Sequence, residues 1–279
     1  MKLDMGQAWD GAMTLLRGNR EMVFVLAGLF FFLPNFALVL FAPEAMSPAQ
    51  PPPPADPGDL DATMQAMGDL MVAHYQEFWW AYLIIAILQA VGMLSLLALL
   101  TDRERPTVGQ AIKQGFGSLL PYFLAQLIII AGASVVIGLL LGIFSLTGLA
   151  AVGFLIAFPI LVYVFVKTSL VAAVIAIEKV SNPITAISRS WKLTKGNSLR
   201  LFFFLILLML AIGVIGLIVG LVGGVVFALL GSSLEVIGNG LTSSLLSAVM
   251  ATIFLAVFAA VHRQLSDVST GVKASETFE

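Results

Sequence analysis

The sequence predicts an all-α polytopic membrane protein with six transmembrane helices. Apolar residues make up 59% of the 279 residues and charged residues only 11%, whereas a soluble domain has roughly 45–50% and about 25%. A membrane span needs roughly 20 mostly apolar residues, and six stretches satisfy this requirement. They are Met22–Ala42, Trp79–Leu100, Leu119–Phe144, Leu149–Lys167, Leu201–Leu230 and Leu241–Val261.

The basic residues set the orientation of these spans. All fourteen Lys and Arg residues fall before span one, between spans two and three, at or between spans four and five, or after span six. The opposite loops carry acidic residues and no basic residue. Because Lys and Arg accumulate on the cytoplasmic side, both termini are predicted to be cytoplasmic. Lys167, at the end of span four, is expected to extend to the cytoplasmic boundary.

The chain is interpreted as one membrane domain, 1–279, with an outer loop at 43–78 and a cytoplasmic tail at 262–279. The outer loop begins with a proline-rich part that is expected to be extended and ends with an amphipathic helix leading into span two. The apolar character of span four continues to Ile177. We therefore expect this helix to tilt, to bend near Pro159 or to project beyond the membrane.

Three similar segments precede spans one, three and five. The first, Gly6–Asn19, and the third, Ile184–Asn197, align without gaps and both end in Gly-Asn; the middle one, Gly109–Phe116, shares Gln-Ala with the first and lacks that ending. Each is predicted to form a short amphipathic helix at the cytoplasmic face. The predicted fold is therefore three repeats of an interfacial helix and two spans, with chance similarity as the alternative.

The third segment carries a family resemblance. Glu178, Ser181-Asn182-Pro183 and the run Ala186–Asn197 resemble the signature of the glycerophosphoryl diester phosphodiesterase membrane-domain family and the related YciC-like bacterial inner-membrane proteins. Val261-His262-Arg263 is similar to the family's aromatic-Arg ending of the last span, with His262 in place of the usual tyrosine. The resemblance implies a bacterial inner-membrane module without the catalytic barrel of the fused enzymes.

No catalytic site, cofactor or metal site is predicted. The chain has no cysteine and only two histidines, and it lacks H-E-x-x-H, G-x-S-x-G and Walker motifs. The net charge of −2 argues against a nucleic-acid partner. The polar residues within the predicted spans either hydrogen-bond between helices or line a pathway. They are Asn35, Gln89, Gln126 and Tyr163.

Basic and aromatic residues near the cytoplasmic face are the predicted lipid-headgroup residues. Basic side chains there attract anionic lipid by roughly 1 kcal/mol each, or they only enforce orientation. The candidates are Arg189, Lys192, Lys195, Arg200, Trp191, Trp9 and Arg17. The predicted function is a non-enzymatic protein that interacts with or organises membrane lipid or other membrane proteins. The alternative is a transporter or lipid translocator with a cavity between the repeats.

Overall fold

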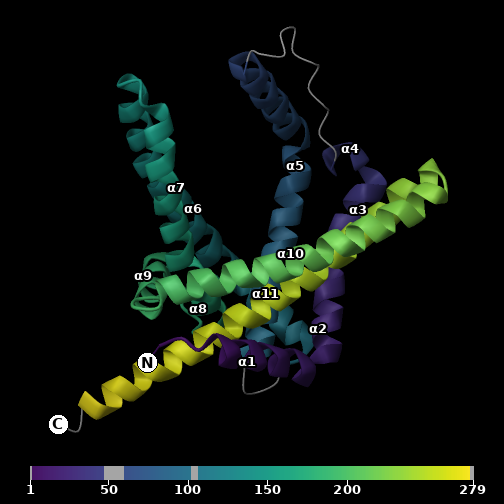
Figure 1. The fold of residues 1–279 in the computed structure, drawn as a ribbon. Helices are drawn as coiled ribbons and strands as arrows, with labels where there is room; N and C mark the ends of the chain where they lie inside the picture. Colours follow the sequence, from purple (N-terminus) through teal and green to yellow (C-terminus); the bar gives the residue numbers. More distant parts are fainter. Residues whose placement is uncertain (1, 47–59, 102–105, 277–279) are drawn as a thin grey trace.

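The computed structural model describes residues 2–46, 60–101 and 106–276, and every regular element in these residues is a helix (Figure 1). Six of the helical segments are long and apolar enough to cross a membrane, which confirms the predicted all-α membrane fold; the threefold repeat stays a prediction. The segments are Arg20–Phe41, Ala62–Thr101, Val108–Leu146, Ala151–Ile177, Ser198–Leu229 and Leu234–Ser266.

The first span is interrupted by one π-helical turn. It consists of α2 (Arg20–Ala27), the π turn η1 (Gly28–Phe32) and α3 (Leu33–Phe41). The turn comes just before Pro34, which has no N–H to continue the regular hydrogen-bond ladder. Pro34 is followed by Asn35, so a proline and a polar residue stand together here inside an apolar run.

The first and third predicted interfacial helices are separate elements. Helix α1 (Met5–Gly18) is capped by Asp4, whose carboxylate accepts a hydrogen bond from the Gln7 amide over 3.0 Å. Helix α9 (Pro183–Leu193) is capped by Asn182, whose side-chain oxygen accepts from the amides of its first turn. Gly196, at φ +79°, then turns the chain into the next helix.

Spans two and three lie in helices longer than predicted. Helix α5 (Leu60–Thr101) includes the predicted outer helix without a break, after the short α4 (Pro43–Met46). The proline-rich part of the loop lies outside the described residues. Helix α6 (Val108–Leu146) includes the middle similar segment and begins with a capping box between Thr107 and Gln110. This segment lacks the Gly-Asn ending, so its helix continues directly into the span.

The fourth apolar stretch is divided, but not at the predicted proline. Helix α7 (Ala150–Thr168) continues through Pro159, and the chain breaks after it at Ser169 and Leu170 before α8 (Val171–Ile177). The hydroxyl of Thr168 donates to the Val164 carbonyl, and that of Ser169 donates to the Val166 carbonyl. Hydroxyl groups bonded to nearby carbonyls compete with the regular helix ladder, which favours a break here.

Helix α8 lies at the centre of a cluster of buried apolar residues. We call this cluster the basal core; it comprises α8 and the buried parts of the helices around it. The residues of α8 are Val, Ala and Ile only, so this helix is apolar on every side, and five of the seven are buried. It packs against α5, α6, α9 and α11 (Ser232–Glu276). Helix α1 packs on α11 beside it, and the start of α10 (Ser198–Leu229) also lies in this cluster.

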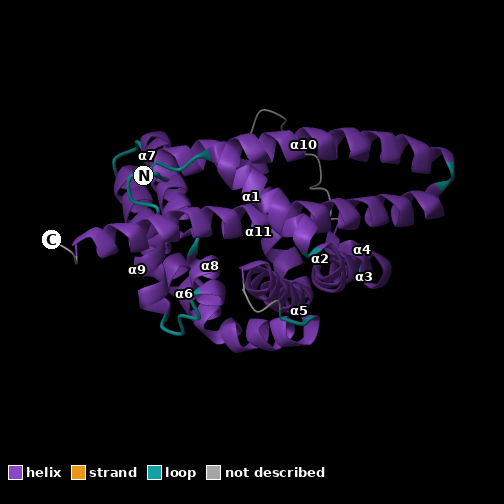
Figure 2. Cartoon of the chain, turned by 90° about the horizontal axis from the view of Figure 1, so that it is seen from below, coloured by secondary structure: helices purple, strands orange, loops and turns teal. Residues whose placement is uncertain are grey.

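Three arms diverge from the basal core (Figure 1). They are the outer part of α5, the α6–α7 pair and the α10–α11 pair, and the last of these extends well beyond the other helices in the view from below (Figure 2). The segment before α1 and the last turns of α11 lie near the end of the molecule that carries α1 and α9, whereas the α6–α7 and α10–α11 turns lie at the far ends of their arms. The arms leave much of the spans' apolar surface exposed.

Candidate functional site

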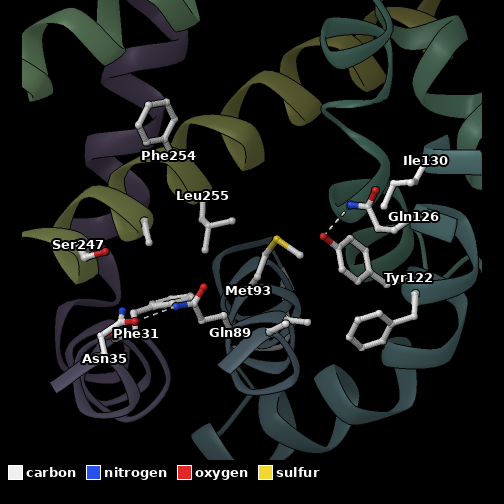
Figure 3. A pocket seen from close by; sticks show the side chains of 14 residues that line it. Phe31, Asn35, Gln89, Met93, Tyr122, Gln126, Ile130, Ser247, Phe254 and Leu255 are labelled. Atoms are coloured by element: carbon white, nitrogen blue, oxygen red, sulfur yellow. Dashed lines mark hydrogen bonds between the residues drawn. The ribbon is translucent and has the colours of Figure 1, made fainter. Parts of the chain in front are cut away.

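A cavity of about 610 Å³ lies between the first span, α5, α6 and α11 (Figure 3). We call it the polar groove, because three of the four polar residues predicted within the spans line it. They are Asn35, Gln89 and Gln126, each from a different span. Tyr122 and Ser247 also line it, apolar side chains form the rest of the wall, and no charged residue is among those that line it.

Asn35 and Gln89 form a polar pair on one wall. The Asn35 amide nitrogen donates to the Phe31 carbonyl over 2.8 Å, and the Gln89 amide nitrogen donates to the Asn35 side-chain oxygen over 3.4 Å. Helix α5 comes this close to the π turn because residue 92 is glycine: a Cβ there would lie 2.4 Å from the Cβ of Phe30. The predicted hydrogen bonding between helices is therefore present at this pair.

A second polar pair faces the first across apolar side chains. The Gln126 amide nitrogen donates to the Tyr122 hydroxyl over 2.7 Å, within α6. Met93 and Leu255 lie between the two pairs (Figure 3). Tyr122 is absent from the predicted site, although its spacing of four residues from Gln126 places both on one helix face.

The fourth polar residue, Tyr163, lies elsewhere. Its ring on α7 meets the Trp191 ring of α9 edge-on, with centroids 5.7 Å apart, and the Lys167 ammonium is 5.6 Å from each centroid. Lys167 is only 4% exposed, so its charge rests against these rings and does not extend freely to the boundary. The Ser190 hydroxyl donates to the Lys167 carbonyl over 2.7 Å. Tyr163 thus belongs to the packing of α9 on α7.

Arg189 is engaged within the protein. Its Nε donates to both oxygens of the Glu178 carboxylate over 3.1 Å, and Nε2 of His262 lies 3.0 Å from the same carboxylate. Burial alone would raise the pKa of Glu178, but the hydrogen bond with His262 and the charge and hydrogen bonds of Arg189 outweigh it and hold the pKa below its ordinary value. This cluster joins two residues of the family resemblance, Glu178 and His262, which the sequence does not indicate to be partners.

Arg200 holds the N-terminal segment. Its guanidinium donates to the Leu3 carbonyl over 3.3 Å, and the Asn197 side-chain oxygen accepts from the Leu3 amide over 2.8 Å. Leu3 is buried. The other predicted headgroup residues are at the surface and exposed: Lys192, Lys195, Arg17, Trp9 and Trp191.

Three further grooves between the helices have almost entirely apolar walls. One of about 320 Å³ lies between α6, α7 and α9 and includes Trp191. A second of about 440 Å³ lies between α1, α2, η1 and α11, and a third of about 420 Å³ lies between α7, α10 and α11. Together with the polar groove, they lie between neighbouring helices of the membrane-spanning part.

Comparisons of the chain with family models, curated proteins and solved structures found no match. The resemblance to the glycerophosphoryl diester phosphodiesterase membrane-domain family therefore stays a prediction.

Proposed function

We propose that this chain is a non-enzymatic membrane protein that binds membrane lipids in the grooves between its helices and so organises the lipid around it. The observation that supports this is the set of four grooves between apolar spans, three of them with almost no polar surface. At membrane depth the surrounding solvent is the acyl chains of lipids. Such chains match these walls, whereas water or an ion would find no partner there.

The location and partners belong to the same proposal. The resemblance supports a bacterial inner membrane, and the basic residues support cytoplasmic termini. The exposed Lys192, Lys195 and Arg17 would attract anionic headgroups. Trp9 and Trp191, each about two-fifths exposed at 38% and 39%, would lie at headgroup depth.

Lipid translocation is a second candidate, and the polar groove favours it. Two polar pairs, Asn35–Gln89 and Tyr122–Gln126, face the same cavity. Polar groups within a membrane span are costly and mark pathways when they are not structural. A lipid headgroup crossing the bilayer would exchange hydrogen bonds with these amides and this hydroxyl.

Filling the polar groove tests the proposal. Ala86 is an exposed residue that lines the groove, so Ala86→Trp should occupy it without disturbing the core. Ala211→Trp is the matched control, because Ala211 is exposed on α10 and lines none of the four grooves. We expect native mass spectrometry to show fewer retained lipids for Ala86→Trp and an unchanged number for the control. Equal numbers for both variants and the wild type would contradict lipid binding in this groove.

A vesicle assay separates the two candidates. Protein reconstituted with a fluorescent lipid in one leaflet should leave the rate of exchange at that of protein-free vesicles if it only organises lipid. Faster exchange with the wild type, slowed by Ala86→Trp but not by Ala211→Trp, would establish translocation instead.

A further inference from the structure

The groove of about 440 Å³ between the first span and α11 has one charged residue in its wall, Arg20. Along one side it is lined by residues such as Val23, Ala27 and Phe32, and along the other by Leu245 and Val249. Its second polar residue, Thr252, donates its hydroxyl to the Ala248 carbonyl over 2.7 Å. The wall therefore presents apolar surface everywhere except at Arg20.

The charge lies at one end of the groove. Arg20 is the first residue of α2, and Phe32 follows twelve residues later in the same span. At 1.5 Å per residue these positions are about 18 Å apart along the helix. Arg20 lies on the side that carries the basic residues, and the apolar wall runs from it toward the middle of the membrane.

The positive charge at this end is not neutralised within the described part of the chain. Arg20 is exposed and forms no ion pair with another described residue, and the same holds for Arg17, three residues earlier on α1. Glu21 is adjacent in sequence, but it does not line the groove, and no acidic residue does. An elongated apolar groove with a positive end is complementary to an acyl chain that carries an anionic headgroup.

We infer that this groove binds one acyl chain of an anionic phospholipid, with the phosphate of its headgroup at Arg20. The inference rests on the proposed lipid-binding function and adds the class of lipid and its site. A guanidinium suits this role because its planar set of donors matches two phosphate oxygens. The acyl chain covers Val23, Ala27 and Val249, which otherwise face each other across an unfilled groove.

Removing the charge at Arg20 tests the inference. Arg20→Gln keeps a polar side chain, and Lys113→Gln is the matched control, because Lys113 is exposed on α6 and lines none of the four grooves. Wild type and Lys113→Gln should bind phosphatidylglycerol more tightly than phosphatidylcholine in a native mass spectrometry titration. Arg20→Gln should lose about tenfold of that preference, which corresponds to about 1.4 kcal/mol.

The position of the bound acyl chain can be measured separately, by cross-linking. Phosphatidylglycerol with a photoreactive group in its acyl chain should cross-link to the α11 peptide around Leu245 and Val249, and less so in Arg20→Gln. Equal headgroup preference for Arg20→Gln and Lys113→Gln, or cross-links only elsewhere, overturns the inference while leaving lipid binding in place. Tighter binding of oleate than of phosphatidylglycerol overturns the phospholipid assignment. If the wild type retains no lipid at all, the proposed function fails with it.

Discussion

Glu178 connects parts of the chain that are far apart in sequence. Its carboxylate binds Arg189, eleven residues later on α9, and His262, 84 residues later on α11. The three side chains therefore hold the end of α8, the interfacial helix and the last span together. His262 is only 3% exposed, while Glu178 and Arg189 are partly exposed.

Glu178→Gln should lower the thermal unfolding midpoint of the detergent-solubilised protein at pH 7. The expected loss is on the order of 1 kcal/mol, because hydrogen bonds to charged groups stabilise more than this but solvent screens a partly exposed pair. The pKa of Glu178 is lowered from its ordinary 4.5. Its contribution is thus fully present above pH 4.5 and is lost as the pH falls through the lower native value.

The wild type should therefore lose more stability than Glu178→Gln between pH 7 and the acid range. Glu21→Gln, at an exposed position of α2, is the control and should leave the midpoint close to that of the wild type. Identical acid sensitivity of Glu178→Gln and wild type would show that this cluster does not stabilise the fold.

Asn197→Ala should release the N-terminal segment. The Leu3 amide donates to the Asn197 side chain over 2.8 Å, so its hydrogen exchange should accelerate when that acceptor is removed. Asn239→Ala is the control. Asn239 lies near the start of α11, and its replacement should leave hydrogen exchange at Leu3 unchanged. Equal protection of Leu3 in both variants would mean that Arg200 and burial suffice to hold it.

At the scale of single residues, the sequence shows which polar residues are unusual within the spans, but it does not show which residues they contact. Asn35, Gln89 and Gln126 stand out because they are polar within apolar runs, and all three line one cavity. The sequence does not predict which of them bond to each other, or that Tyr163 lies elsewhere. These facts depend on the sides on which the helices pack, and small residues such as Gly92 decide this.

At the scale of elements, helix existence was predictable and helix length was not. The length of an apolar stretch matches the thickness of the bilayer. Hydropathy therefore predicts the membrane-spanning parts of α5 and α6, but not the helical turns that continue beyond the apolar stretch. The division between α7 and α8 coincides with the hydroxyls of Thr168 and Ser169, which bond to carbonyls of the preceding turn. The separate ends of α1 and α9 both lie near a Gly-Asn pair, a signal that the sequence does contain.

The close packing of α5 against α6 can be tested by replacing the glycine at the contact. A Cβ at Gly115 would lie 2.1 Å from the Ser95 hydroxyl and 2.8 Å from the Val91 carbonyl, whereas nothing lies within 4 Å of the same position at Gly117. Gly115→Ala should therefore destabilise the protein by about 1–3 kcal/mol, as overpacking does, and Gly117→Ala should not. Chemical unfolding in detergent measures both; equal stability would show that the two helices can separate freely.

At the scale of the whole molecule, the basal core and the diverging arms lie beyond what composition predicts. Six apolar spans are compatible with a closed bundle as well as with this arrangement. The difference arises because the buried residues concentrate around α8 and one end of the spans, whereas the outer parts of α6 and α10 keep exposed apolar surface. Composition therefore does not predict which helices pack against each other.

The predicted orientation can be tested with single cysteines, since the chain has none of its own. Thr147→Cys lies in the α6–α7 turn and Lys113→Cys near the start of α6, and both positions are exposed. A membrane-impermeant maleimide added to intact spheroplasts should label position 147 and not position 113. The reverse pattern would invert the orientation, and labelling of both would contradict a span between them.

The docking of the N-terminal segment sets an order of events during synthesis. Leu3 meets Asn197, a residue made 194 positions later, and α1 packs chiefly on α11, which follows the other five spans in the sequence. The newly made α1 therefore lacks its main packing partner until the five earlier spans have been made. An amphipathic helix can wait at the headgroup boundary, where both of its faces are accommodated. A nascent chain that stops before α11 would have five inserted spans and Asn197 to bind Leu3, but it would still lack the helix on which α1 mainly packs.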